Sequence, residues 1–190
     1  MSDWCENTAI IEHREPGVGP TMIQRVVDGF RRGALFSEFM PTPAELLEHG
    51  VPVRDPALLE RFVKEYGARD WYDWQMLHWG VKDDVGSLDD GIEVISTTRV
   101  RLTFRSRICP PVAGYRSLCD MNFEIEAFYH HPVQMYCGHF TGAKGGKRDD
   151  YMDYASETAH TVRREVSERV DQFYGISERL ARVEEEHYDE

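Results

Sequence analysis

Four arginines at alternate positions are the sharpest chemical feature of the sequence. Residues 98–108 alternate between apolar and polar side chains, which predicts a strand whose outward side carries Arg99, Arg101, Arg105 and Arg107. Alternate residues of a strand lie about 6.6 Å apart, so the guanidinium groups could bind phosphates or an acidic partner. No aromatic residue is interleaved with them to stack on bases. The alternative is a salt-bridged face, because four glutamates have outward parity on the neighbouring expected strands: Glu6, Glu12, Glu124 and Glu126.

A second basic feature is a glycine-rich stretch between an expected strand and an expected helix. A Walker-type phosphate loop has four residues between its glycines, followed by Gly-Lys-Ser/Thr. Here three residues separate Gly142 from Gly146, and Arg148 follows Lys147, so the hydroxyl that would bind magnesium is missing. We expect a flexible turn, with anion binding by Lys144, Lys147 and the helix start as the alternative.

Nitrogen and sulfur ligands occur together at His130, His131, Cys137 and His139. His131, Cys137 and His139 share strand parity, but Pro132 interrupts the strand between the two histidines and the Cys137–His139 pair. None of the standard ligand spacings of a zinc site is present. We therefore expect a turn with two surface histidines and a buried thiol, and we assign no metal and no cofactor; a zinc-dependent hydrolase is the alternative.

The remaining polar and aromatic clusters indicate structure rather than catalysis. The acidic pairs at 83–84 and 89–90 lack the spacing of a calcium loop, so we expect them to be solvated. No Gly-x-Ser-x-Gly nucleophile motif occurs. Trp71, Trp74 and Trp79 follow helical spacing, which favours a place in the core over base stacking. Because no catalytic set is complete, we assign no catalytic residue and expect no enzymatic activity.

Composition and charge exclude several classes of protein. The chain has 190 residues, of which 41% are hydrophobic and 12% aromatic, and this excludes a disordered acidic protein. No long apolar run and no secretory signal are present, so we expect neither membrane insertion nor export. The four cysteines are widely separated, and we expect them to be reduced thiols. With 22 basic and 34 acidic residues, the net charge is −12. This disfavours wholesale binding to nucleic acid.

The order of expected elements predicts an α+β fold, with helices over one face of an antiparallel sheet. Strands are expected at 4–13, 92–95, 98–108, 123–129 and 133–140, with helices at 22–32 and 112–119 and a helical insertion at about 41–80. We expect two units: residues 1–147 with the sheet, and residues 148–190 with a long helix and an acidic tail.

The expected C-terminal helix has an apolar stripe at helical spacing over residues 151–173. The stripe would pack on the sheet or form a homodimer with a second copy. The segment from 148 to 190 holds 13 acidic and 6 basic residues, and Asp149, Asp153 and Glu157 would form one acidic line along the helix. That line suggests DNA mimicry, although nearby arginines dilute the negative charge.

Several segments in order resemble the YubB-like family of phage- and plasmid-encoded proteins with a ferredoxin-like domain. They cover about residues 3–141: the sequences at 4–7 (WCEN), 40–46 (MPTPAEL), 66–74 (YGARDWYDW), 78–83 (HWGVKD), 109–111 (CPP), 128–129 (FY) and 136–138 (YCG). The chain departs from the family at 81–83 and 108–111, where Thr-Lys-Trp and Trp-Ser-Pro-Pro are common. The resemblance implies a ferredoxin-like fold without an iron–sulfur cluster, in an accessory gene of a mobile element. It implies no activity.

These observations predict a non-enzymatic accessory protein of a phage or plasmid. We expect it to bind a host protein in the host cytoplasm, in host takeover or counter-defence. The alternative is single-stranded nucleic-acid binding through the four arginines.

Overall fold

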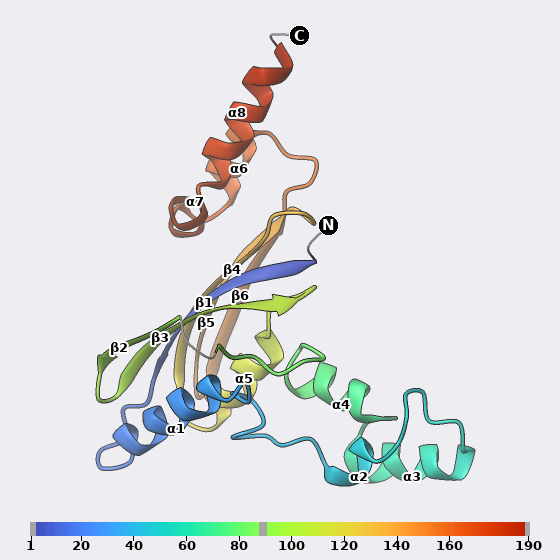
Figure 1. Cartoon of the computed structure of the whole chain (residues 1–190). Helices are drawn as coiled ribbons and strands as arrows, with labels where there is room; N and C mark the ends of the chain where they lie inside the picture. Colours follow the sequence, from blue (N-terminus) through green and yellow to red (C-terminus); the bar gives the residue numbers. More distant parts are fainter. Residues whose placement is uncertain (1–2, 88–90, 189–190) are drawn as a thin grey trace.

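Six strands form one antiparallel sheet in the order β2-β3-β1-β4-β5-β6 (Figure 1). The computed structural model describes residues 3–87 and 91–188. The strands are β1 (Trp4–Glu12), β2 (Ile92–Ser96), β3 (Arg99–Arg107), β4 (Glu124–His131), β5 (Tyr136–Ala143) and β6 (Gly146–Asp153). The first strand therefore lies in the centre of the sheet, between β3 and β4.

Helices connect the strands in the ferredoxin-like order. They are α1 (Gly19–Arg31), α2 (Ala44–Leu47), α3 (Pro56–Tyr66), α4 (Trp71–His78), α5 (Val112–Asp120), α6 (Ala159–Glu165), α7 (Glu168–Tyr174) and α8 (Ile176–Tyr188). Strands β1 to β4, with α1 and α5 as crossovers, have the βαββαβ arrangement, and β5 and β6 extend the sheet. The predicted α+β class is confirmed, and α2–α4 form the expected helical insertion. No helix among the described residues has the length and apolar composition needed to cross a membrane.

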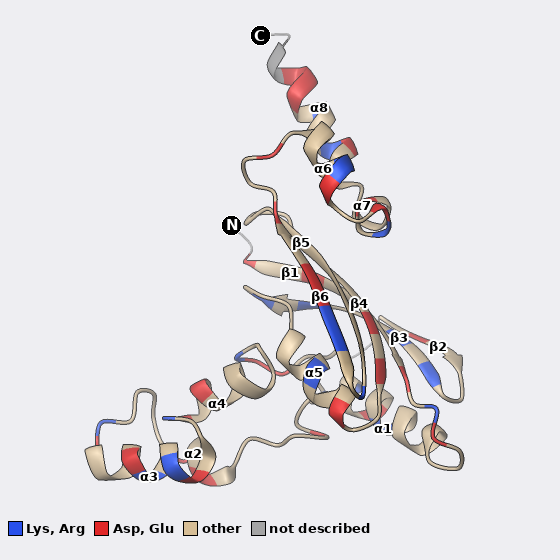
Figure 2. Cartoon of the chain, turned by 180° about the vertical axis from the view of Figure 1, so that it is seen from behind, with Lys and Arg blue, Asp and Glu red and all other residues tan. Residues whose placement is uncertain are grey.

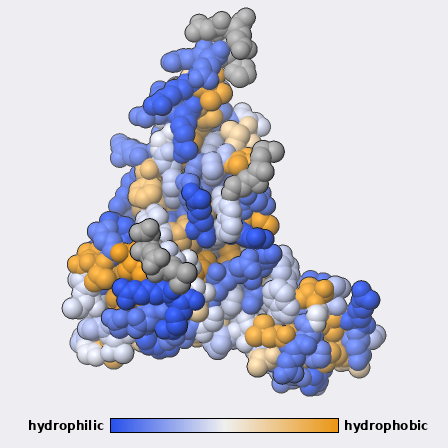
Figure 3. Space-filling model, in the orientation of Figure 1, coloured by the Kyte–Doolittle hydropathy of each residue, from blue (hydrophilic) through white to orange (hydrophobic). Residues whose placement is uncertain are grey.

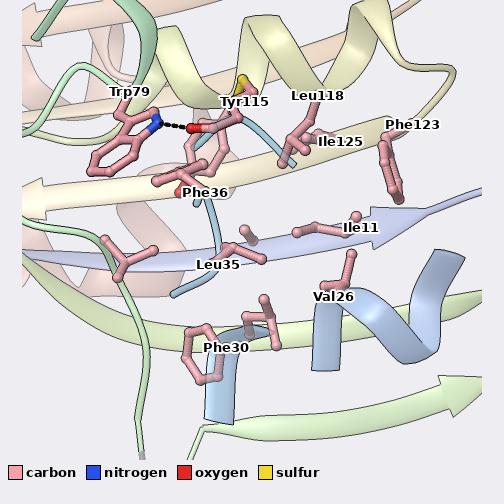
Figure 4. Packing of buried hydrophobic residues seen from close by; sticks show 14 of the residues in the cluster. Ile11, Val26, Phe30, Leu35, Phe36, Trp79, Tyr115, Leu118, Phe123 and Ile125 are labelled. Carbon is pink, nitrogen blue, oxygen red and sulfur yellow. Dashed lines mark hydrogen bonds between the residues drawn. The ribbon is translucent and has the colours of Figure 1, made fainter. Parts of the chain in front are cut away.

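The main core lies between the sheet and the two crossover helices (Figure 4). Alternate residues of the strands, such as Ile11 and Ile125, are buried there against Val26, Phe30 and the rest of the cluster. The indole of Trp79 is 3% exposed. Its Nε1 donates a hydrogen bond to the Met40 carbonyl at 3.1 Å, and Trp74 is buried beside it, with Trp71 packed at the margin. The prediction that the tryptophans belong to the core is confirmed.

The continuous helix expected over residues 151–173 does not form. Its first part is strand β6, which pairs with β5 along its whole length, so β6 also crosses the expected boundary at 147/148. The remainder is divided because Thr158 and Ser167 cap two separate helices, accepting hydrogen bonds from the backbone N–H groups of Thr161 and Val170. Gly175, with φ of 61°, ends α7. Helical spacing of apolar residues was therefore misleading here.

The C-terminal helices cover one end of the second face of the sheet (Figure 1). Val162, Val166 and Val170 are buried against Phe128 and Cys137 of β4 and β5. Helices therefore lie on both faces, in contrast to the single face expected from the sequence. The three valines are occupied within the chain and would contribute nothing to the homodimer, which stays a prediction.

Candidate interaction surface on the sheet

The part of the second sheet face that the helices leave open carries the four arginines. Along β3 the buried side chains are Val100, Leu102, Phe104 and Ser106, and the alternate positions are half-buried or exposed. The predicted parity is therefore confirmed. We call this surface the arginine face: it comprises Arg99, Arg101, Arg105 and Arg107 of β3, with Glu6 and Glu12 of β1 and Glu124 and Glu126 of β4.

Basic and acidic side chains alternate across neighbouring strands of the arginine face. The register of β1 and β3 places Glu6 opposite Arg105 and Glu12 opposite Arg99. Arg101 forms an ion pair with Glu93 of β2, the next strand outward. Cross-strand pairs of opposite charge contribute about 0.2–1 kcal/mol each. The glutamates predicted from strand parity therefore lie on the same face as the arginines. The ion pairs within 4 Å, however, do not always join the residues that are opposite each other in the strand register.

Two of the arginines have no ion pair among the residues that the structure describes. Glu12 is opposite Arg99 but forms its ion pair with Arg14, whose Nε lies 2.8 Å from the Glu12 carboxylate. The hydrogen bond from Arg14 lowers the pKa of Glu12, with a smaller effect of Arg99. The Nε of Arg99 is buried without a hydrogen-bond partner in the described chain, and Arg105 is exposed. Both guanidinium groups thus keep hydrogen-bonding capacity.

Arg107 lies at the far end of the face, opposite Trp4 at the start of β1. Its Nε is 3.7 Å from the carboxylate of Asp83. Its guanidinium also lies 5.5 Å from the ring centroid of Trp4, a cation–π contact. Trp4 is 37% exposed. An aromatic side chain therefore lies next to this arginine, where the sequence pattern suggested none.

A stack of three rings borders the face on its other side. His139 and Phe128 stack with centroids 4.5 Å apart, and Phe128 and Phe173 stack at 5.3 Å. Phe173, on α7, is 51% exposed. Glu126, beside the stack, accepts from Arg169 at 2.6 Å and lies 3.2 Å from His139 Nε2. Sequence reasoning missed this stack because Phe173 was assigned to a helix with no known position on the sheet.

A shallow groove crosses the open end of the face between β1, β4 and β5. Its volume is about 570 Å³, and its lining includes Ile10, Arg99, Glu124 and Gly142. A second hollow of about 350 Å³, lined in part by Ile10, Arg101 and Phe173, continues toward α7. The groove is lined by apolar residues and by charges of both signs, which suits a ligand of mixed charge better than a uniformly charged one.

The two predicted lysines differ in their place relative to the arginines: Lys147 lines the same groove as Arg99, and Lys144 does not. Lys144 is exposed at the β5–β6 turn, whereas Lys147 forms an ion pair with Asp120 of α5, on the opposite face. Strand β6, not a helix, follows the glycine-rich turn. The expected helix start is therefore wrong, and anion binding by Lys144 and Lys147 stays a prediction.

The four possible metal ligands do not converge on one point, although His130 lies opposite Cys137 in the sheet. His130 and His131 are neighbours on β4, so they point to opposite faces, and each is at most 1% exposed. His130 Nε2 lies 2.5 Å from the Tyr154 hydroxyl, and burial lowers its pKa to about 4. His131 Nδ1 accepts from the backbone of Gln134. The expectation of surface histidines is wrong, and that of a buried Cys137 thiol is confirmed; no three ligands converge within the described ranges.

The acidic pair at 83–84 has two different environments. Asp83 is exposed, but the carboxylate of Asp84 accepts from the backbone N–H groups of Phe36, Ser37 and Val85. The expected solvation of Asp84 is therefore wrong, because it holds a loop in place. The pair at 89–90 lies outside the described residues.

Comparisons with known proteins provide no activity. No protein-family model and no curated protein matches the sequence. The fold is similar to a solved structure of a protein named api92 from Yersinia pseudotuberculosis, whose family name is DUF1281. The TM-score is 0.46 at 12% sequence identity, and the match covers 82% of this chain and 99% of that one.

Proposed function

We propose that the chain is a non-enzymatic binding protein that docks a partner protein on the arginine face. The observation that carries this proposal is the alternation of basic and acidic side chains on an open sheet surface, as in Glu6–Arg105 and Glu12–Arg99. Charges arranged in this way select a partner with the complementary pattern and exclude partners of uniform charge. Ile10, one of the apolar residues that line the groove, offers a contact for an anchoring side chain.

Electrostatics favour a protein over a nucleic acid as this partner. A phosphate backbone lying across the arginines would also meet the four glutamates of the face. The net charge of −12 adds long-range repulsion. A protein surface can present acidic groups to Arg99 and Arg105 and basic groups to Glu124, which a polyanion cannot do.

The resemblance supports a cellular setting for this function. We propose an accessory protein of a phage or plasmid that acts on a host protein in the host cytoplasm, in host takeover or counter-defence. DNA mimicry is not part of the proposal, since Asp149 and Asp153 lie on β6 and Glu157 lies outside the helices. Asp149 moreover accepts a hydrogen bond from Tyr129 at 2.8 Å.

Single-stranded nucleic acid is the second candidate, and a specific observation favours it. The exposed rings of Trp4 and Phe173 flank the arginine face on its two sides. Aromatic rings combined with basic side chains are the usual means of stacking and holding single strands. Arg99 and Arg105 would then contact phosphates.

Charge reversal distinguishes the two candidates. The double variant Arg101→Glu, Arg105→Glu reverses two charges on the face, and Arg31→Glu, Arg164→Glu makes the same net change on α1 and α6. Affinity for a partner isolated with the wild-type chain should fall about tenfold or more in the first variant only. Equal retention by both variants refutes docking on the arginine face. Binding of a single-stranded oligonucleotide at low salt, lost in the first variant only, would instead establish the second candidate.

A further inference from the structure

The two edges of the sheet differ in how they are protected against pairing with another strand. An edge strand exposes backbone N–H and C=O groups, and charged side chains discourage association there. The charged residues of the β6 edge are Lys147, Arg148, Asp149, Asp150 and Asp153 (Figure 2). Strand β2 has only Glu93, beside Val94 and Ile95, which are 61% and 41% exposed. A hydrophobic patch lies at this edge in Figure 3.

The register identifies the backbone groups that β2 presents outward. The Thr103 N–H donates to the Gly91 carbonyl at 2.7 Å. Hydrogen-bonded and non-hydrogen-bonded pairs alternate in an antiparallel ladder, so Glu93 exchanges hydrogen bonds with Arg101. Ile92 and Val94 belong to the other class and turn their N–H and C=O groups away from β3. No described strand pairs with that side of β2.

The side chains of β2 define what an added strand should carry. Val94 is opposite Val100 and lies on the core side, whereas Glu93 is opposite Arg101 and lies on the same side of the sheet as the arginine face. A residue hydrogen-bonded to Val94 has its side chain on the same side as Val94, so an apolar side chain fits there. The neighbouring residue lies beside Glu93, whose side chain is 60% exposed, so a basic side chain fits there.

A second copy of the chain is a poor occupant of this edge. Pairing two β2 strands through Ile92 and Val94 brings Glu93 of each copy opposite the other. Like charges directly opposite are destabilising. Each copy also has a net charge of −12. The occupant that fits the charge is therefore a basic and apolar segment of a different protein.

We propose that the open edge of β2 binds an extended segment of another protein as an added antiparallel strand, with apolar and basic residues in alternation. This is a strand-addition site. It is separate from docking on the arginine face, so either proposal can fail without the other.

The test uses the full chain and short synthetic peptides of alternating valine and lysine. Two peptides of equal charge are compared, one N-methylated at the valines and one at the lysines. In the proposed geometry the valine N–H groups face β2, so methylation there should weaken binding about tenfold or more. Methylation at the lysines should not. Backbone NMR of the chain should show the binding shifts at the amides of Ile92 and Val94.

A variant of the chain with a reversed charge at position 93 provides a second experiment. Glu93→Lys should reverse the preference, so that a valine–glutamate peptide binds better than the valine–lysine peptide. Equal binding of the two methylated peptides overturns the proposal, because attraction to an acidic protein alone would explain it. Absence of shifts at millimolar peptide overturns it as well. A concentration-dependent dimer abolished by Val94→Lys would replace the proposed occupant with a second copy.

Discussion

Acid should destabilise the protein through one buried histidine. His130 is 1% exposed and lies beneath the C-terminal helices. Its Nε2 contacts the Tyr154 hydroxyl, and its Nδ1 has no hydrogen-bond partner in the described chain, with the Glu6 carboxylate 4.0 Å away. Burial lowers the pKa of His130 from 6.5 to about 4, with smaller effects of the charges of Arg179 and His131.

The direction of the effect follows from proton linkage. Between pH 6.5 and about pH 4 the unfolded chain carries the proton and the folded chain does not, so the free energy of unfolding falls as the pH is lowered. A difference of about 2.5 between the two pKa values corresponds to about 3 kcal/mol. This contribution is constant above pH 6.5, and its loss is complete below about pH 4.

Urea unfolding followed by tryptophan fluorescence at a series of pH values measures the effect. His130→Gln keeps a polar side chain near Tyr154 but cannot take up the proton. The loss of stability between pH 6.5 and 4 should therefore be smaller by about 3 kcal/mol in this variant. The exposed His160→Gln provides a control that should follow the wild type. Identical pH dependence of His130→Gln and wild type would refute the reasoning.

Three substitutions and one control, Asp83→Ala, test other contacts, each measured as the change in the free energy of unfolding by urea. Asp84→Ala leaves loop N–H groups unpaired and should cost about 3 kcal/mol, whereas Asp83→Ala should change stability by less than about 0.5 kcal/mol. Equal effects would contradict the structural role of Asp84. A Cβ at Gly138 would overlap the Tyr129 side chain, so Gly138→Ala should cost about 2 kcal/mol or more; a neutral result would place Tyr129 elsewhere. Trp79→Phe leaves a buried carbonyl without its donor and should cost about 2 kcal/mol; an unchanged midpoint would exclude that hydrogen bond.

The arginine face was predictable because its pattern is local. Strict alternation along β3 determines which side chains share a face, and parity alone placed Glu6 and Glu12 beside the arginines. The contacts were not predictable in the same way. That Arg14 binds Glu12 and leaves Arg99 unpaired depends on a loop whose path no periodicity encodes.

The structure of the C-terminal part was not predictable from the helical spacing of its apolar residues. Two other features decided it: the pairing of β6 with β5, and the helix-capping residues that divide the rest. Tyr151 lies in a strand held by β5, a pairing that depends on the fold of the preceding hairpin. Thr158 and Ser167 are good helix N-cap residues and were the local indication of two short helices. Missing this division also hid the ring stack that Phe173 completes.

Because β1 lies in the centre of the sheet, the two halves of the sheet are held together by its most N-terminal strand. Strands β2 and β3 form one hairpin and β4 to β6 form one meander; of the strands that the structure describes, only β1 joins the two edge to edge. Deleting the first dozen residues would therefore split the sheet into two pieces rather than shorten it. During synthesis on the ribosome β1 emerges before both of its partner strands, which follow about a hundred residues later, and this separation favours slow folding.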